Sequence, residues 1–199
     1  IGSFLVDGRR EGFARNEADA IAGGGVIGAG GFTLTDYRVR ADETVSPPGE
    51  AFKRAMASVN EARTYVAAMC VAMVDACLET AVAYGKTRSA FGGPLSAKQG
   101  WRWTAADIAT DAEAARLLVA KAADLIERKA DAALASAHAK KFTTRMAVQR
   151  ISDACQLMGA AGLREDYPFI RHLASARVAS YTDGSTEMQN ERIAALFIG

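Results

Sequence analysis

The run Tyr65-Val-Ala-Ala-Met-Cys-Val-Ala-Met-Val-Asp-Ala-Cys-Leu-Glu-Thr-Ala-Val-Ala-Tyr-Gly-Lys-Thr87 decides the fold of this chain. Its large apolar residues recur at helical spacing, mostly four positions apart: Met69, Met73, Val74, Leu78 and Val82. Because this spacing places them on one face of an α-helix, the run predicts an amphipathic helix. The helix is expected to begin at Glu50, after the Ser46-Pro-Pro-Gly49 break, and to end near Thr87.

Further runs of helical spacing follow this one along the chain. They predict helices at about Ser96–Lys129, Asp131–Met158 and Phe169–Ser180, and a short last helix that ends at Phe197. The runs are rich in alanine, and small side chains let helix axes approach closely. The sequence therefore predicts a mainly α fold, an up-down four-helix bundle with a short terminal helix, preceded by a small β segment.

Residues 1–45 have the pattern of strands and loops. Phe4–Val6 is a short apolar run, and Phe32–Val39 alternates apolar and polar residues, as a half-buried strand does. The glycine-rich run 23–31 lacks the Lys-Ser/Thr ending of a phosphate-binding loop, so a flexible β connection is expected there. Two strands do not make a stable sheet. We therefore predict that residues 1–45 end a β domain and that residues 46–199 form the helical domain.

Composition limits the classes of partner and site. The chain has 199 residues, of which 50% are hydrophobic and 24% charged, with a net charge of +1. Nucleic acids and anionic membranes attract a basic surplus, so neither is expected as a partner, and no membrane span is expected. Cys70, Cys77 and Cys155 lack zinc-type spacing and favour reduced thiols in the cytoplasm. His138 and His172 are isolated, so no metal site is predicted.

The sequence Thr-Asp-Gly-Ser-Thr-Glu-Met-Gln places Asp183 in a turn just before the last helix. Aspartate in this position is most often a helix N-cap, and the pattern alone favours that interpretation. Ser185 or Thr186 could cap the helix equally well, with Glu187 or Gln189 completing a capping box. In that case Asp183 would be free for another role.

Two helix ends carry residues that a plain bundle does not need. Arg88 and Phe91 follow the first long helix; an arginine there suits a pyrophosphate, although it could also bond the last carbonyls of its own helix. A glycine cap explains Gly162 at the end of the third helix. It does not explain Gly159 inside the last turn, where close approach of a backbone or a ligand is the physical reason for a glycine.

Taken together, these phrases resemble the acyl-CoA dehydrogenase family over almost the whole chain. The family pattern Tyr-x-x-x-Arg-x-x-Phe-Gly-x-Pro-Leu lies over residues 84–95, and Gln-x-x-Gly-Gly-x-Gly lies over residues 156–162. The family's Tyr-Pro is at residues 167–168, and its Tyr-Glu-Gly-Thr-Ser-Glu-Ile-Gln phrase lies over residues 182–189. Four phrases in this order make the resemblance specific.

The resemblance implies an FAD-dependent enzyme that oxidises an acyl-CoA thioester to the enoyl-CoA. Asp183 stands where the family usually has its glutamate base, and Glu187 is the alternative carboxylate. Asn60 and Arg63 match a stretch that meets the acyl-CoA, although Asn60 replaces a common aspartate. The cofactor contacts that the resemblance implies, several of them to the FAD of a neighbouring subunit, are Arg88, Phe91, Gln99, Gln156, Leu157, Met158, Gly159, Ser185 and Glu187.

The resemblance also implies partners and a longer protein. An acyl-CoA substrate, an electron-transfer partner protein and a homo-oligomer, either a dimer or a tetramer, are expected. The family's front part has no counterpart here, so the chain is expected to be a C-terminal fragment of a longer enzyme. Asp183 and Ala160, which replaces the family's second glycine, leave open a non-catalytic or partner subunit of a hetero-oligomer. A plain helical interaction module is the third alternative.

Overall fold

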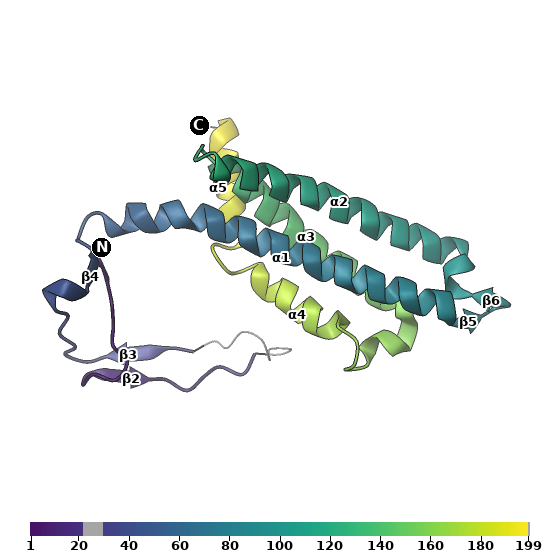
Figure 1. The fold of residues 1–199 in the computed structure, drawn as a ribbon, viewed down its shortest axis with the longest axis horizontal. Helices are drawn as coiled ribbons and strands as arrows, with labels where there is room; N and C mark the ends of the chain where they lie inside the picture. The colour runs from purple at the N-terminus through teal and green to yellow at the C-terminus, as the bar shows by residue number, and fades with distance from the viewer. Residues whose placement is uncertain (22–29, 199) are drawn as a thin grey trace. The chain divides into compact units, whose positions relative to one another are not determined.

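The structure is a computed structural model that describes residues 1–21 and 30–198 (Figure 1). Its contacts divide the chain into two compact units, Ile1–Val59 and Asn60–Gly199, and each is treated by itself below. The division falls within the first long helix. The predicted domain boundary after residue 45 stays a prediction.

The described residues of the first unit, 1–21 and 30–59, contain two small antiparallel pairs of strands. Strand β1 (Ser3–Phe4) pairs with β4 (Thr44–Ser46), and β2 (Phe13–Arg15) pairs with β3 (Phe32–Leu34). A 3-10 helix, η1 (Ala41–Glu43), precedes β4. The rings of Phe13 and Phe32 stack across the second pair, with centroids 5.2 Å apart.

The structure limits two of the predictions for this unit. The strand expected over Phe32–Val39 ends at Leu34, because Asp36 takes a left-handed backbone conformation with φ 49°. Most of the glycine-rich run lies outside the described residues, so its predicted β connection stays a prediction.

Five helices confirm the predicted mainly helical fold. They are α1 (Ala51–Thr87), α2 (Gln99–Glu127), α3 (Ala133–Met158), α4 (Phe169–Ala179) and α5 (Thr186–Ile198). Their bounds agree with the predicted ranges to within three residues. Helix α3 packs against α2, α4 and α5, so it is the central helix of the bundle (Figure 1).

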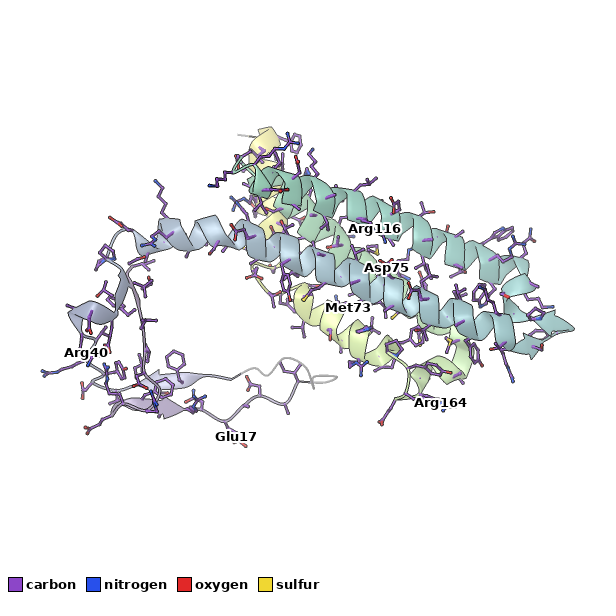
Figure 2. The ribbon with its side chains drawn as sticks, in the orientation of Figure 1. Glu17, Arg40, Met73, Asp75, Arg116 and Arg164 are labelled. Carbon is purple, nitrogen blue, oxygen red and sulfur yellow. The ribbon has the colours of Figure 1, made fainter. Side chains whose placement is uncertain are left out.

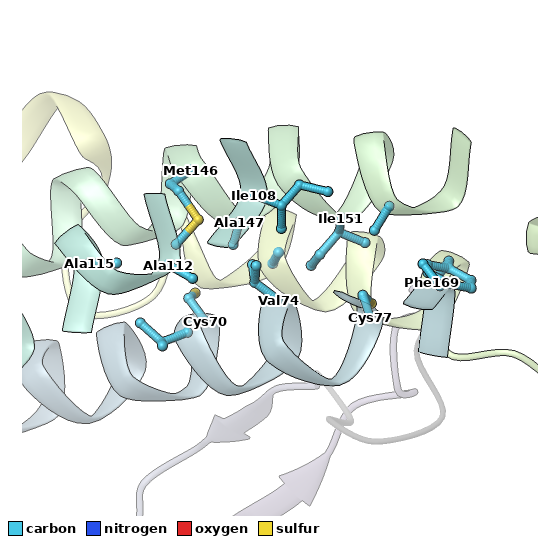
Figure 3. Close-up of a cluster of buried hydrophobic side chains, with 14 of the residues drawn as sticks. Cys70, Val74, Cys77, Ile108, Ala112, Ala115, Met146, Ala147, Ile151 and Phe169 are labelled. Atoms are coloured by element: carbon cyan, nitrogen blue, oxygen red, sulfur yellow. The ribbon is translucent and has the colours of Figure 1, made fainter. Parts of the chain in front are cut away.

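The core consists largely of small side chains. Cys70, Val74 and Cys77 of α1 are fully buried, as are Ile108 of α2 and Ile151 of α3 (Figure 3). Alanines fill most of the space between them, which lets the helix axes approach closely. Burial raises the pKa of both Cys70 and Cys77 to about 12, so these thiols serve as small apolar groups.

An ion pair supports the same packing at the bundle surface. Arg116 of α2 donates to Asp75 of α1 at 2.8 Å (Figure 2), and Arg116 also pairs with Glu113 one turn earlier on α2. Both partners in the interhelical pair are partly exposed, so the pair fixes the register of α1 and α2 more than it stabilises the fold.

A β-hairpin that the sequence did not predict joins α1 to α2. Strands β5 (Ser89–Ala90) and β6 (Gly93–Pro94) pair around a two-residue turn, and the 3-10 helix η2 (Leu95–Ala97) follows. Helix α2 therefore begins at Gln99 instead of Ser96. A third 3-10 helix, η3 (Gly159–Leu163), follows α3.

Helix α1 is long and apolar enough, on length and composition alone, to cross a membrane. One 18-residue window of it has a mean hydropathy of 1.8, and 39% of that window is buried within the structure. A core helix of a bundle has the same composition, and the buried face of α1 lies in such a core. This composition is thus weak evidence for a membrane span.

Candidate functional site

The turn between α4 and α5 presents an exposed carboxylate. Asp183 has φ 51° and Gly184 has φ 94°, so two successive residues take left-handed conformations. Helix α5 begins at Thr186, and the backbone N–H of Gln189 donates to the Ser185 carbonyl at 3.1 Å. Ser185 therefore occupies the N-cap position. Asp183 lies outside the helix, and in the described part of the chain its carboxylate forms no hydrogen bond or ion pair.

Three donors from three helices hold the backbone of this turn. Arg63 of α1 donates through Nε to the Asp183 carbonyl at 3.1 Å. Lys140 of α3 donates through Nζ to the Gly184 carbonyl, and Gln189 of α5 donates through Nε2 to the same oxygen at 3.1 Å. The backbone of the turn is thereby fixed to three helices of the bundle.

The two cations beneath the turn are buried. Arg63 is 6% exposed and Lys140 is 1% exposed. Burial lowers the pKa of Arg63, as does the charge of Arg192, whereas the charge of Asp183 opposes this shift. Burial also lowers the pKa of Lys140, and Asp183 again acts in the opposite direction. Asp183 is thus close enough for its charge to act on both cations.

Glu187 lies on the first turn of α5 and is exposed. A hydrogen bond from Ser185 lowers the pKa of its carboxyl group. Its position at a helix N-terminus favours the same charged form. The Glu187 carboxylate is therefore hydrogen-bonded at the start of its own helix, whereas among the described residues the Asp183 carboxylate has no partner.

The two residues predicted to bind substrate lie one helical turn apart on α1, beside this turn. Ser136 of α3 donates through Oγ to Oδ1 of Asn60 at 3.3 Å, so Asn60 is oriented by the bundle. Arg63 uses Nε for the turn, but its buried Nη1 has no partner among the described residues. A buried guanidinium nitrogen without a partner is an unsatisfied donor, which native structures rarely leave.

The remaining predicted residues lie at the other end of the bundle (Figure 1). Phe91 and Gly92 form the β5–β6 turn, with φ 52° and 80°, the signature of a type I′ turn. The Phe91 ring is 91% exposed, and Lys98 donates to the Phe91 carbonyl at 2.6 Å. Arg88 is exposed at the start of the hairpin.

The C-terminal end of α3 belongs to the same region. Trp101 of α2 donates through Nε1 to the Leu157 carbonyl at 3.1 Å, which joins the start of α2 to the end of α3. Leu157 and Met158 are buried, so their side chains belong to the core. Gly159 is exposed with φ 59° and ψ −147°, and a Cβ there would meet nothing within 4 Å.

Two surface pockets complete the description. One, of about 510 Å³, is lined by Gln99, Arg102 and Trp103 near the start of α2. A larger one, of about 880 Å³, lies between α2, α3, α4 and α5 and includes Glu187. Neither pocket is lined by Asp183 or Arg63. Among the described residues no cluster could hold a metal ion.

The predicted residues thus form two separate groups. Asn60, Arg63, Asp183, Ser185 and Glu187 lie near the turn before α5. Arg88, Phe91, Gln99 and residues 156–159 lie at the hairpin end. Lys140, near the first group, and Leu157, in the second, share one helix, so at a rise of 1.5 Å per residue their backbones are roughly 25 Å apart.

Lys140 and Gln189 were not singled out from the sequence. A lysine in an alanine-rich helix is usually exposed. The signal was available in the spacing, because Lys140, Thr144, Ala147 and Ile151 recur at three- and four-residue intervals and all four are buried. Gln189 was considered only as part of a capping box.

Comparisons with known proteins agree with the sequence pattern. The family profile described as "Acyl-CoA dehydrogenase, C-terminal domain" matches residues 49–197. An acyl-CoA dehydrogenase of Bacillus subtilis is 35% identical over the whole chain, which covers 52% of that protein. The short-chain specific acyl-CoA dehydrogenase of Bos taurus mitochondria is 31% identical over 95% of the chain, which covers 46% of that protein.

Solved structures give the same result. Butyryl-CoA dehydrogenase from Megasphaera elsdenii matches the whole chain with a TM-score of 0.93 and 28% identity, and the chain covers 52% of it. A structure titled for the electron transferring flavoprotein of Acidaminococcus fermentans matches with a TM-score of 0.92 and 29% identity. The chain spans about half the length of the relatives it matches. With the family profile covering residues 49–197, the chain belongs to the acyl-CoA dehydrogenase family.

Proposed function

We propose that this chain is the C-terminal part of an FAD-dependent acyl-CoA dehydrogenase that converts an acyl-CoA thioester to the enoyl-CoA. The observation that carries the proposal is the turn before α5. There an exposed, unpartnered Asp183 carboxylate is held on a backbone fixed by Arg63 and Lys140. A general base needs a free carboxylate on a rigid support, and this turn supplies both.

In this proposal Asp183 removes a proton from the carbon next to the thioester carbonyl. The α C–H bond breaks and the proton moves to a carboxylate oxygen of Asp183. When bound, FAD supplies the acceptor for the hydride that leaves the β-carbon. Glu187 is the weaker candidate for the base, since its carboxyl group is hydrogen-bonded by Ser185 at the start of α5.

Asn60 and Arg63 are the proposed substrate contacts of this chain. The unpartnered Nη1 of Arg63 is a donor for an oxygen of the acyl-CoA, while Nε stays on the Asp183 carbonyl. The Arg63 guanidinium would then bind both the substrate and the backbone carbonyl of Asp183. This arrangement would fix the distance between the α-carbon and the carboxylate.

The residues at the hairpin end fit a flavin nucleotide. Arg88 offers an exposed guanidinium, which suits a pyrophosphate, and the open space over Gly159 lets a planar group reach the backbone. Ser185 and Glu187 are the corresponding contacts near the base. Because the two groups are roughly 25 Å apart along α3, we assign the hairpin end to the FAD of a neighbouring subunit.

This assignment requires a homo-oligomer, a dimer or a tetramer. The bundle carries exposed large apolar side chains that a partner subunit could cover: Tyr65, Trp103, Leu117, Leu163, Ile170 and Tyr181. An electron-transfer flavoprotein is the proposed partner for reoxidation. The three free cysteines support a reducing, cytoplasmic location.

A non-catalytic partner subunit is the second candidate. Two departures from the family pattern favour it: Asp183 is one methylene shorter than glutamate, and Ala160 places a methyl group beside Gly159. A subunit of this kind would not respond to any acyl-CoA, whether or not it binds FAD.

Anaerobic mixing of the FAD-loaded, full natural protein with a panel of acyl-CoAs separates these candidates. We expect bleaching of the flavin absorbance with at least one acyl-CoA. The Asp183→Asn variant should bleach at least about 100-fold more slowly, since a general base contributes about 10²–10⁴ in rate. Bleaching that survives in Asp183→Asn would assign the base elsewhere, with Glu187→Gln tested next. Bound FAD that no acyl-CoA bleaches would favour the partner subunit.

A further inference from the structure

Lys140 is a charged group in an unusual place. It is 1% exposed and lies in the N-terminal part of α3 between the buried Ser136 and Thr144. Its ammonium group reaches the turn before α5 and donates to the Gly184 carbonyl. In the described residues Lys140 forms no ion pair.

The surroundings of Lys140 make this burial costly. The charged and titratable groups that act on it are Asp183, Arg63 and the thiol of Cys70, and Arg63 is a second cation. Burying an ammonium group without an ion-pair partner is unfavourable, and an apolar side chain of similar volume would often stabilise such a site. The packing of α3 therefore does not account for a lysine here.

The contacts of Lys140 account for it better. Gly184 directly follows Asp183, and its carbonyl receives both Lys140 Nζ and Gln189 Nε2. Gly184 has φ 94°, and a Cβ there would lie 3.3 Å from Nη2 of Arg63. The cations of α1 and α3 thus bind two successive carbonyls, those of Asp183 and Gly184, and so hold the left-handed backbone of the exposed Asp183.

We infer that Lys140 is a positioning residue for the proposed base: its ammonium group fixes the Gly184 carbonyl, and with it the direction of the Asp183 carboxylate. The inference rests on the proposed function. Lys140 touches neither substrate nor cofactor in this scheme and acts through the turn. Gln189 shares the acceptor but is neutral, so Lys140 alone combines this hydrogen bond with a positive charge near Asp183.

Lys140→Met tests the inference, because methionine keeps an unbranched side chain only one atom shorter and removes the charge and the donor. In the FAD-loaded, full natural protein, we expect flavin reduction at saturating acyl-CoA to slow about 10- to 100-fold, as misplaced catalytic groups do. The acyl-CoA concentration at half-maximal rate and the flavin content should stay within about twofold of wild type. The melting temperature should be unchanged or higher.

A second measurement does not depend on activity. Amide hydrogen exchange of the peptide 181–189 should accelerate about tenfold in Lys140→Met, since a hydrogen bond from a charged donor is lost. Peptides from the middle of α1 and α3 should keep their exchange rates. Lys140→Arg, which restores the charge and the donor, should recover most of the exchange protection and most of the rate of flavin reduction. If Lys140→Met does not fold, Lys140→Gln takes its place. Lys121→Met, an exposed lysine on α2, is the matched control.

Unchanged exchange at residues 181–189 would overturn the positioning role. So would a loss of rate that is fully explained by lost flavin or by unfolding of the variant at the assay temperature. These outcomes can be distinguished from the case in which the proposed function itself is wrong. In that case wild type itself would not bleach with any acyl-CoA, whereas the exchange measurement would still report whether Lys140 holds the turn.

Discussion

Phe91 takes a backbone conformation that suits asparagine or glycine better than an aromatic residue. Its φ is 52° in a type I′ turn, and its ring is 91% exposed, so no packing compensates for the strain. Phe91→Asn creates the preferred Asn-Gly turn sequence. We expect it to raise the free energy of unfolding by up to about 1 kcal/mol while weakening FAD binding. Thermal unfolding and flavin titration of the apoprotein measure the two effects.

Lys129 provides a matched control for this substitution. It also has a positive φ, 55°, at the exposed end of α2, which is the opposite end of that helix from the hairpin. Lys129→Gly should stabilise the protein by a similar amount, about 0.5–1 kcal/mol, and leave FAD binding unchanged. If Phe91→Asn also leaves FAD binding unchanged, the exposed ring is not a cofactor contact.

At the level of single residues, the sequence pointed to Asp183 and Arg63 but not to what holds them. Both belong to phrases that resemble a family motif. Lys140 lies 43 positions before Asp183 in an ordinary alanine-rich helix, and its contact depends on how α3 meets the turn before α5. Contacts of this kind arise from helix packing, which single-sequence periodicity does not specify.

Among the small elements, the 3-10 helix η1 depends on one buried carboxylate. Glu43 is 8% exposed, pairs with Arg10 and accepts from the Arg40 backbone N–H at 2.9 Å. The hydrogen bond from Arg10 lowers the pKa of Glu43 from 4.5 to about 2. A carboxylate whose pKa is lower in the folded state stabilises the fold above its unfolded-state pKa. This stabilisation is lost as the pH falls through the folded-state pKa. Local stability should therefore decline between pH 4.5 and 2.

Glu43→Gln tests this dependence. We expect the variant to be less stable than wild type near pH 6, with the difference shrinking as the pH falls toward 2. Hydrogen exchange of the β4 amides, Thr44–Ser46, corrected for intrinsic rates, reports the local stability. Asp42→Asn, which alters an exposed pair with Arg40, should show little difference at any pH. A constant difference between wild type and Glu43→Gln would contradict the assignment.

The long helices could be predicted because their periodicity extends over many turns and their ends carry Pro and Gly signals. The β5–β6 hairpin could not, because its strands have two residues each and its turn holds Phe91 where asparagine or glycine is usual. Likewise, the strand expected to reach Val39 stops at Leu34, because Asp36 takes a left-handed conformation that alternation of side chains does not reveal.

On the scale of the whole molecule, the distance between the two groups of proposed residues makes a prediction about subunits. If Arg88 contacts the FAD of a neighbouring subunit, each active site combines Asp183 of one subunit with Arg88 of another. Arg88→Ala and Asp183→Asn should each be inactive alone. In a mixed dimer, one site is intact and the other carries both defects, so co-expression should restore about a quarter of wild-type flavin reduction if subunits mix at random.

A mixture of Arg63→Ala with Asp183→Asn is the control, because both residues lie at the same end of the bundle and contact each other. Every site of that mixed dimer carries one defect, so no activity should return. If the Arg88→Ala and Asp183→Asn mixture also stays inactive while mixed oligomers are isolated by two different affinity tags, both groups of residues serve the same subunit. The flavin would then have to extend along α3 within one subunit, and the exposed apolar face of the bundle would need another explanation than a shared active site.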